Sequence, residues 1–421
     1  MTEHRKRLAG NFISLSMVQG LSLLFPLIIF PYLLRVLGVE GFGIFTLIQT
    51  AIMYFDLLIS FGFGLTATKQ VTASIEDPHR MKQIIASVYL LKLMLFAASL
   101  ICFLLAAVFV PYLQQNLILL LISSVYLLGN LLFPDWYFQG VQQMKNIAFV
   151  ALISKLISLV LIILLVKDRG DISYAILSMS VGNLIAGVIA FFIMAKKAAF
   201  KLILPTKNFM SMMFRESAFV FSSVILVPFY SSINIFILQA FSNPLIVGYY
   251  AVAEKISNAA AMLTSIANRT IYPHLALLYS SSIEAYKKNV RSALKLFFVG
   301  FLILSAIQFF AAEEIIRLIS GKTNMDDISY SVEILKIMSI GLFFSPYTSF
   351  LFQLLIIQDE KKEAVKNIII TVIINAITAC LFAYFYSGKG MAVNYCIIIF
   401  VITLLNYLSY SKSKIGESRS L

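Results

Sequence analysis

The sequence predicts an all-α integral membrane protein with about twelve transmembrane helices, and three observations carry this fold class. Hydrophobic residues make up 60% of the 421 residues and charged residues only 13%, against roughly 45–50% and about 25% in soluble domains. The apolar residues run for about 20 positions at a time, the helix length that crosses a hydrocarbon core of about 30 Å. Most of the 33 lysines and arginines fall in alternate connections between these runs.

The apolar runs predict twelve spans in chain order. The first follows Arg5-Lys6-Arg7 but is too long for a signal-peptide core, so it is expected to remain as a span. The eighth is the least apolar because Glu254 and Lys255 interrupt it. Helices are expected rather than a barrel because ten-residue alternating segments are absent from the sequence. The predicted spans lie near residues 11–34, 42–65, 84–110, 117–138, 147–166, 172–195, 217–241, 245–267, 294–312, 332–357, 365–386 and 391–410.

The formal net charge of +13 is distributed unevenly along the chain. Positive residues cluster before the first span, in every second connection and after the last span, whereas the other connections hold few. Because cytoplasmic connections of membrane proteins carry an excess of Lys and Arg, both termini are expected in the cytoplasm. A membrane accounts for this placement better than nucleic acid does, and no nucleic-acid partner is expected.

A weak internal duplication divides the chain. Residues 42–45 (FGIF) align with residues 247–250 (VGYY) at an offset of about 205, and prolines recur in the first and fourth spans of each half. The two halves have the same in-out sense, so we expect a parallel repeat related by an axis along the membrane normal, as in some transporters. The predicted organisation is therefore a six-helix bundle at 1–195, a basic cytoplasmic linker at 196–216, a second six-helix bundle at 217–410 and a cytoplasmic tail at 411–421.

Catalytic and metal-binding motifs are weak in this sequence. Cys102, Cys380 and Cys396 all lie in apolar runs and form no spaced pair, so neither a disulfide nor a zinc site is expected. The three histidines have no spacing suited to a metal or a catalytic triad. Residues 320–323 (SGKT) end like a phosphate-binding loop but lack its first glycine, and residues 62–67 (GFGLTA) close a span instead of linking a strand to a helix. A transporter is expected rather than an enzyme.

Ionisable residues inside predicted spans are the strongest functional signal. A charge at the bilayer centre costs about 2.5–3.5 kcal/mol on insertion scales and normally faces a cavity or a partner. Structural pairing is an alternative for Asp56 and for Glu254 with Lys255, and Lys92 and Asp135 could extend to an interface instead. Lysines in a cavity would suit an anionic cargo such as a diphosphate. The residues in question are Asp56, Lys92, Asp135, Lys155, Glu254, Lys255 and Lys336.

Several stretches together resemble the O-antigen and related polysaccharide flippases, a family in the superfamily that also holds multidrug and toxin extrusion proteins. The resemblance covers nearly the whole chain. Residues 134–140 (PDWYFQG) are similar to that family's Pro-x-Trp-Phe-Phe-Gln-Gly stretch, with tyrosine for one phenylalanine. The other stretches are Asn11 with Gln19, 31–38 (PYLLRVLG), 41–43 (GFG), 62–69 (GFGLTATK), 247–250 (VGYY), 253–256 (AEKI) and 272–273 (YP).

This resemblance implies a V-shaped pair of six-helix bundles around a central cavity, which opens alternately to the two sides of a bacterial inner membrane. The implied cargo is an undecaprenyl-diphosphate-linked oligosaccharide, with membrane lipids, a glycan polymerase and a chain-length regulator as further partners. No cofactor is expected, and H⁺ or Na⁺ is the coupling ion to test, with Asp56 and Glu254 as the first carboxylates. A monomer is expected. The residues predicted to present positive charge to the cargo are Lys92, Lys155, Lys255, Lys336, Arg35 and Arg269.

Two other classes stay open at this level. A cation-coupled exporter of drugs or metabolites on the same fold would be dominated by buried carboxylates, whereas the predicted spans hold more lysines. A membrane glycan polymerase or acyltransferase would place His, Arg or Asp in a large outer loop. The longest outer segment, 313–331, has one arginine and no histidine. A purely structural scaffold would leave the costly interior charges unexplained.

Overall fold

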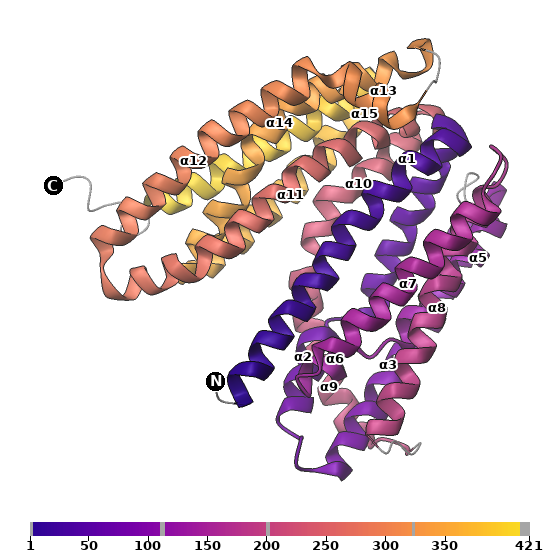
Figure 1. Cartoon of the computed structure of the whole chain (residues 1–421), viewed down its shortest axis with the longest axis vertical. Helices are drawn as coiled ribbons and strands as arrows, with labels where there is room; N and C mark the ends of the chain where they lie inside the picture. Colours follow the sequence, from indigo (N-terminus) through magenta and orange to yellow (C-terminus); the bar gives the residue numbers. More distant parts are fainter. Residues whose placement is uncertain (1–2, 110–113, 199–202, 322–324, 413–421) are drawn as a thin grey trace. The chain divides into compact units, whose positions relative to one another are not determined.

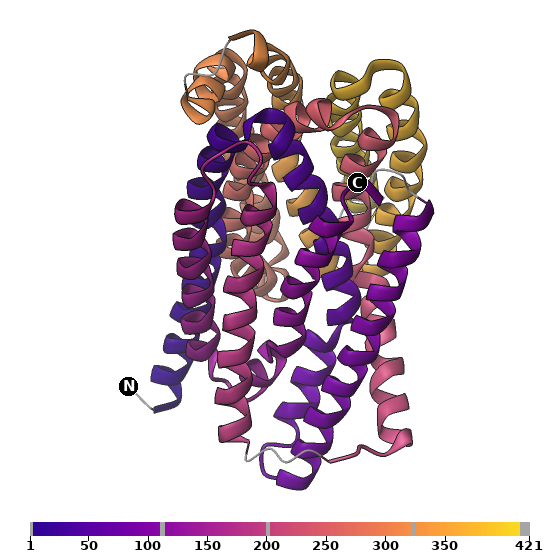
Figure 2. The same cartoon turned by 90° about the vertical axis from the view of Figure 1, so that its right-hand side faces the viewer.

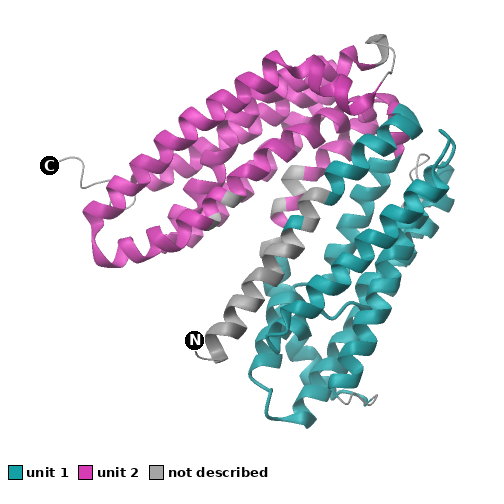
Figure 3. Ribbon diagram, in the orientation of Figure 1, with its two compact units in different colours: residues 1–38, 45–225 teal, residues 39–44, 226–421 magenta. Residues whose placement is uncertain are grey.

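The computed structural model describes residues 3–109, 114–198, 203–321 and 325–412, with side chains described mainly from Phe25 onward. Every regular element in these residues is an α-helix, which confirms the predicted all-α class (Figure 1). Contacts divide the chain into two compact units (Figure 3). Unit 1 contains Met1–Gly38 and Phe45–Ile225, and unit 2 contains Val39–Ile44 and Leu226–Leu421.

Unit 1 holds the helices of the first half of the chain. Its long helices α7 and α8 pack side by side, as two views of the molecule show (Figures 1 and 2). Short helices α2 and α6 pack against each other, and α2 also packs against α9. The bounds are α1 Glu3–Ser60, α2 Phe63–Thr72, α3 Pro78–Phe109, α5 Leu117–Leu132, α6 Asp135–Gly140, α7 Met144–Leu165, α8 Ile172–Lys197 and α9 Lys207–Val224.

Unit 2 is built mainly on α14, which packs against α11, α12 and α15. Two of its helices begin with side-chain caps: Asn243 accepts from the N–H of Ile246 ahead of α11, and Ser282 accepts from the N–H of Ala285 ahead of α12. The bounds are α10 Leu226–Phe241, α11 Pro244–Ser281, α12 Ile283–Phe310, α13 Ala312–Ser320, α14 Met325–Ile357 and α15 Lys361–Lys412.

Eight helices of the described residues are long and apolar enough to cross a membrane. Two of them, Phe25–Thr72 and Lys361–Lys412, each contain two predicted spans. The eight helices therefore account for all the predicted spans except 217–241 and 245–267. The first of these exceptions is divided between α9 and the short apolar helix at Ser232–Phe241, and the second lies on α11, where charged residues dilute the apolar run. The count of twelve spans and their parallel repeat stay predictions.

Two pairs of predicted spans are each joined into one kinked helix. Helix α1 includes the first two spans and bends at Gly38, whose φ of 72° falls in the left-handed region that glycine adopts without steric cost. Helix α15 includes the last two and bends at Ser387, with φ 52°. A serine in this region is strained by about 1–3 kcal/mol. Both kinks fall in the connections that the sequence predicted.

Close helix packing in unit 1 depends on glycine. A Cβ at Gly187 of α8 would overlap the carbonyl oxygen of Gly129 in α5, and a Cβ at Gly182 would overlap the hydroxyl of Ser158 in α7. Helices in lipid gain little from burying apolar surface, so small residues that let backbones approach supply much of their association energy. Gly129, Gly182 and Gly187 thus allow α8 to fit between α5 and α7.

The two stretches that the internal alignment matched lie against each other within unit 2. A Cβ at Gly43 would overlap the carbonyl oxygen of Pro244, and a Cβ at Gly248 would overlap that of Val39. Phe42 and Val247 beside them are buried. Segment Val39–Ile44 is therefore packed backbone to backbone on the first turns of α11.

Alanine at Gly187 is predicted to lower stability, whereas alanine at Gly300 is not. Gly187→Ala would force α5 and α8 apart, which we expect to cost about 1–3 kcal/mol, as overpacking does. Gly300 in α12 has open space around it, so Gly300→Ala should be neutral or stabilise by up to about 1 kcal/mol. Thermal unfolding of the two purified variants measures the difference. Equal melting temperatures would contradict the close packing of α5 and α8.

Candidate functional site

The end of α5 creates a need for hydrogen-bond donors inside unit 1. The helix stops at Leu132, and Phe133 is extended because Pro134 follows it. The last carbonyl groups of a helix have no partner within it and carry partial negative charge. In an apolar interior these groups must find donors on other helices.

Helix α3 supplies those donors. The Lys92 ammonium donates to the carbonyl oxygen of Asn130 at 2.7 Å and lies 3.4 Å from that of Phe133. The Tyr89 hydroxyl donates to the carbonyl oxygen of Leu132 at 2.9 Å. Lys92 is only 3% exposed, so its side chain does not extend to an interface as the sequence allowed. Its first observed role is to cap the end of α5 with a positive charge.

Polar side chains from four further positions complete this charged cluster, which we define as Asp56, Lys92, Asn130, Asp135 and Asn183. The Asn130 amide donates to the Asp56 carboxylate at 2.5 Å, and the Asn183 amide donates to the Asn130 side-chain oxygen at 2.8 Å. Asp56 and Asp135 both act electrostatically on the Lys92 ammonium. The cluster therefore joins α1, α3, α5, α6 and α8.

A cavity of about 200 Å³ borders the charged cluster. Lys92 and Asp135 line it, together with residues 62–65 and Trp136. The Trp136 indole N–H is buried and has no hydrogen-bond partner among the described residues. The cavity thus lies beside an ammonium and a carboxylate in an apolar helix bundle. Such convergence of a few polar groups in an apolar pocket is typical of ligand sites.

Lys155 and Lys336 contact aromatic rings. The Lys155 ammonium of α7 lies 4.5 Å from the ring centroid of Phe25 in α1, and the Lys336 ammonium of α14 lies 6.0 Å from that of Phe309 in α12. No carboxylate of the described residues forms an ion pair with either lysine. A cation over an aromatic face keeps its charge available to an anion.

Glu254 and Lys255 are consecutive residues of α11, and their structural pairing stays a prediction. Glu254 is 8% exposed, and the neighbouring Lys255 is the positive charge that acts on its carboxylate. Beside them in unit 2 runs a chain of buried amides from α10 and both parts of α15. Asn375 donates to Asn234 at 3.0 Å, and Asn394 donates to Asn375 at 2.8 Å.

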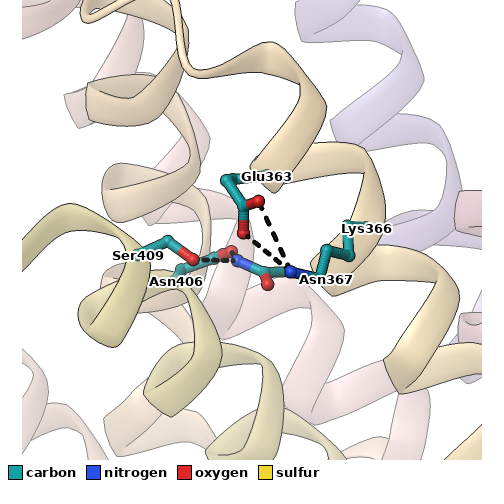
Figure 4. A network of polar contacts seen from close by, with 5 residues as sticks. All are labelled: Glu363, Lys366, Asn367, Asn406 and Ser409. Atoms are coloured by element: carbon teal, nitrogen blue, oxygen red, sulfur yellow. Dashed lines mark hydrogen bonds and ion pairs between the residues drawn. The ribbon is translucent and has the colours of Figure 1, made fainter. Parts of the chain in front are cut away.

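A second amide network joins residues near the start of α15 to residues near its end (Figure 4). The Asn367 amide donates to the side-chain oxygens of Asn406 and Ser409, both at 3.0 Å. The adjacent residue Lys366 pairs with Glu363 at 3.3 Å. Asn367 and Asn406 are buried, whereas Lys366 is exposed. This network fixes the two halves of the kinked helix to each other and lies outside the charged cluster.

The predicted site residues are thus distributed unevenly. The structure brings Asp56 close to Lys92 and Asp135, whereas Glu254 and Lys255 are consecutive in the sequence. Arg35 is exposed on α1 near the kink, and the side chain of Arg269 lies outside the described residues. Their roles toward a cargo stay predictions.

Sequence reasoning missed the asparagines because it searched the spans only for ionisable groups. Buried amides in apolar runs were the available signal. Those in question are Asn130, Asn183, Asn234, Asn375 and Asn394.

Two curated relatives align with 91% and 66% of this chain. A protein of Shigella dysenteriae that carries the name of an O-antigen transporter is 27% identical over 392 residues, which is 91% of this chain and 95% of the relative. A protein of Escherichia coli strain K12 with the same name is 30% identical over 276 residues, 66% of each chain.

Solved structures share the fold at low sequence identity. The lipid II flippase MurJ in an inward closed conformation superposes with a TM-score of 0.72 at 16% identity, covering 97% of this chain and 90% of that one. A multidrug resistance MATE family transporter in an inward-facing conformation gives 0.61 at 13% identity, covering 95% and 100%. Residues 8–279 also match the polysaccharide biosynthesis protein family. Because this match spans more than half of the sequence, the chain belongs to that family.

Proposed function

We propose that this protein is a flippase for a lipid-linked saccharide, and that its cargo is an undecaprenyl-diphosphate-linked oligosaccharide. The cargo moves from the cytoplasmic to the outer leaflet of a bacterial inner membrane by alternating access of two helix bundles. Family membership and two relatives named as O-antigen transporters support the saccharide cargo. The protein acts as a transporter rather than an enzyme.

The observation that carries the proposal is the presence of positive groups inside apolar helix bundles. Lys155 is half-buried and lies over a phenylalanine ring without an ion-pair partner among the described residues. A buried cation is costly unless it serves a partner. A diphosphate supplies the matching negative charge. Its export is favoured by an inside-negative potential, worth about 2.3 kcal/mol per charge per 100 mV.

A cation-coupled drug or metabolite exporter is the second candidate. The shared fold with a multidrug transporter and the buried carboxylates Asp56 and Glu254 favour it. The two candidates differ in the sign of the charge that the cargo carries. An exporter of cations needs carboxylates that are not engaged by lysines. Lys255 acts on Glu254 and Lys92 acts on Asp56, which favours the anionic cargo.

Loss of the protein is predicted to leave the lipid-linked oligosaccharide on the cytoplasmic face. A deletion strain should lose surface glycan and accumulate the lipid-linked intermediate, and the wild-type gene should restore both. Lys155→Ala should reduce export at least about tenfold, the effect of losing about 1.4 kcal/mol of interaction with the cargo. Lys145→Ala removes an exposed lysine of the same helix and serves as the control. Normal glycan with altered drug tolerance in the deletion strain would favour the exporter instead.

Asp56 is predicted to hold the coupling ion, either H⁺ or Na⁺, in the charged cluster. Asp56→Asn keeps the side-chain shape but removes the charge, so translocation should lose its response to an imposed ion gradient. Proteoliposomes containing a fluorescent lipid-linked saccharide measure this response under a proton or a sodium gradient. Asp359→Asn, which removes an exposed carboxylate paired with Lys361, is the matched control. A full response of the Asp56 variant to both gradients would exclude this role.

A further inference from the structure

Two of the predicted spans in unit 1 are broken beside the cavity that borders the charged cluster. The second span breaks at Phe61 and Gly62, which have positive φ angles of 39° and 78° and separate α1 from α2. The fourth span breaks at Phe133 and Pro134, which separate α5 from α6. Gly62 and Asp135, next to these breaks, both line the cavity. A break of this kind frees polar backbone groups inside an apolar bundle, where other parts of the protein must satisfy them.

The two short helices that follow these breaks are fixed to each other. The Thr68 hydroxyl of α2 lies 3.1 Å from the carbonyl oxygen of Trp136 in α6, and the Thr72 hydroxyl lies 3.1 Å from that of Gly140. A Cβ at Gly140 would overlap the side chain of Val71, so the two helices approach closely. We therefore expect α2 and α6 to move as one body.

Lys92 connects the two sides of the break between α5 and α6. From α3 it donates to the carbonyl oxygen of Asn130 at 2.7 Å, before the break, and lies 3.4 Å from that of Phe133, within it. Its ammonium also attracts the carboxylate of Asp135, the first residue of α6. One buried positive charge thus holds the end of one helix and the start of the next.

The hold of Lys92 on α6 depends on the charge of the carboxylates around it. A proton or a sodium ion that neutralises one carboxylate carries the same charge as the ammonium, so the two cations compete for that carboxylate. The adjacent cavity of about 200 Å³ has room for water molecules and for a small cation. The titratable groups that act on one another here are Asp56 of α1, Tyr89 and Lys92 of α3, Tyr126 of α5 and Asp135 of α6.

We propose that Lys92 is a positioning residue that latches α6, and α2 with it, to the end of α5, and that the coupling cation opens this latch by neutralising a carboxylate of the charged cluster. The proposal rests on the proposed function, in which Asp56 holds that cation. In the released state α2 and α6 shift together and water enters the cavity. The cation binds the released state more tightly because the ammonium no longer competes with it there, and this difference in affinity shifts the population.

The only tryptophan of the chain reports on this movement. Trp136 of α6 is 1% exposed, lines the cavity and packs edge to face on Tyr89 with ring centroids 6.1 Å apart. Its fluorescence is measured on the purified full-length protein in phosphatidylcholine nanodiscs, with excitation where tyrosine does not absorb. Release should shift the emission to longer wavelength. A shift from about one tenth released to more than half released should raise quenching by acrylamide at least about threefold.

Acidification and the replacement of choline by sodium at constant ionic strength are the two probes. We expect at least one of them to release the latch in the wild-type protein. Lys92→Met should show the released emission under all conditions, because no ammonium bridges the break. Lys92→Arg keeps the charge and should restore the response. Lys145→Met changes an exposed lysine of α7 and should respond as the wild type does.

A double variant guards against misfolding of Lys92→Met. Lys92→Met with Asp135→Asn removes the ammonium together with one of its carboxylates, so the net charge of the cluster is unchanged. This variant should also be released and unresponsive. A wild-type emission that responds to neither probe would overturn the latch and leave Lys92 with a structural role only. A full response of either variant that lacks the ammonium would overturn it as well.

The fluorescence measurement needs neither cargo nor transport, so its failure is distinguishable from failure of the proposed function. Loss of surface glycan in the deletion strain together with an unresponsive Trp136 would remove only the latch. Normal glycan with altered drug tolerance, together with a response that depends on Lys92, would remove the saccharide cargo and leave the latch as part of an exporter.

Discussion

The absence of water from the hydrocarbon core is the constraint on which the rest of this structure depends. A polar group there must find its partner within the protein, because an unsatisfied group costs several kcal/mol. The break of α5 at Pro134 shows how far this requirement reaches. It frees carbonyl groups that Lys92 and Tyr89 satisfy from α3, and Lys92 in turn draws two carboxylates toward itself. One proline thereby accounts for much of the charged cluster.

The two units meet this constraint with different chemistry. Unit 1 places two carboxylates around one ammonium, so the charged cluster has an uncompensated negative charge when all three groups are ionised. Burial makes such a charge unfavourable, and binding of one proton or cation would remove it. Unit 2 links Asn234, Asn375 and Asn394 through neutral amide groups. This difference is the physical reason for expecting ion coupling in unit 1 rather than in the amide chain.

Most of the fold could be predicted from the sequence, because the length of an apolar run and the position of a glycine determine the structure of their own segment. Run length places the helices, and the kinks at Gly38 and Ser387 fall where polar or glycine-rich connections divide the runs. The break between α9 and α10 was not predicted, since an interruption of one residue leaves hydropathy almost unchanged. Nor could the sequence give the partners of Asp56, because its hydrogen bond with Asn130 and its electrostatic interaction with Lys92 depend on how three helices pack.

The sequence could therefore identify which charged residues are costly to place in a membrane, but not how these residues are arranged in the site. Counting charges favoured lysines as ligands of the cargo, and the structure first assigns Lys92 to the end of α5.

A carrier lipid with a diphosphate head poses two opposite solvation problems. The head needs polar partners in a region that has no water, which the lysines of the bundles can supply. The tail needs none, because the membrane around the protein is already apolar. The free-energy barrier to translocation under the proposed function therefore lies mainly in the desolvation of the head, and positive charges inside the helix bundles lower that barrier.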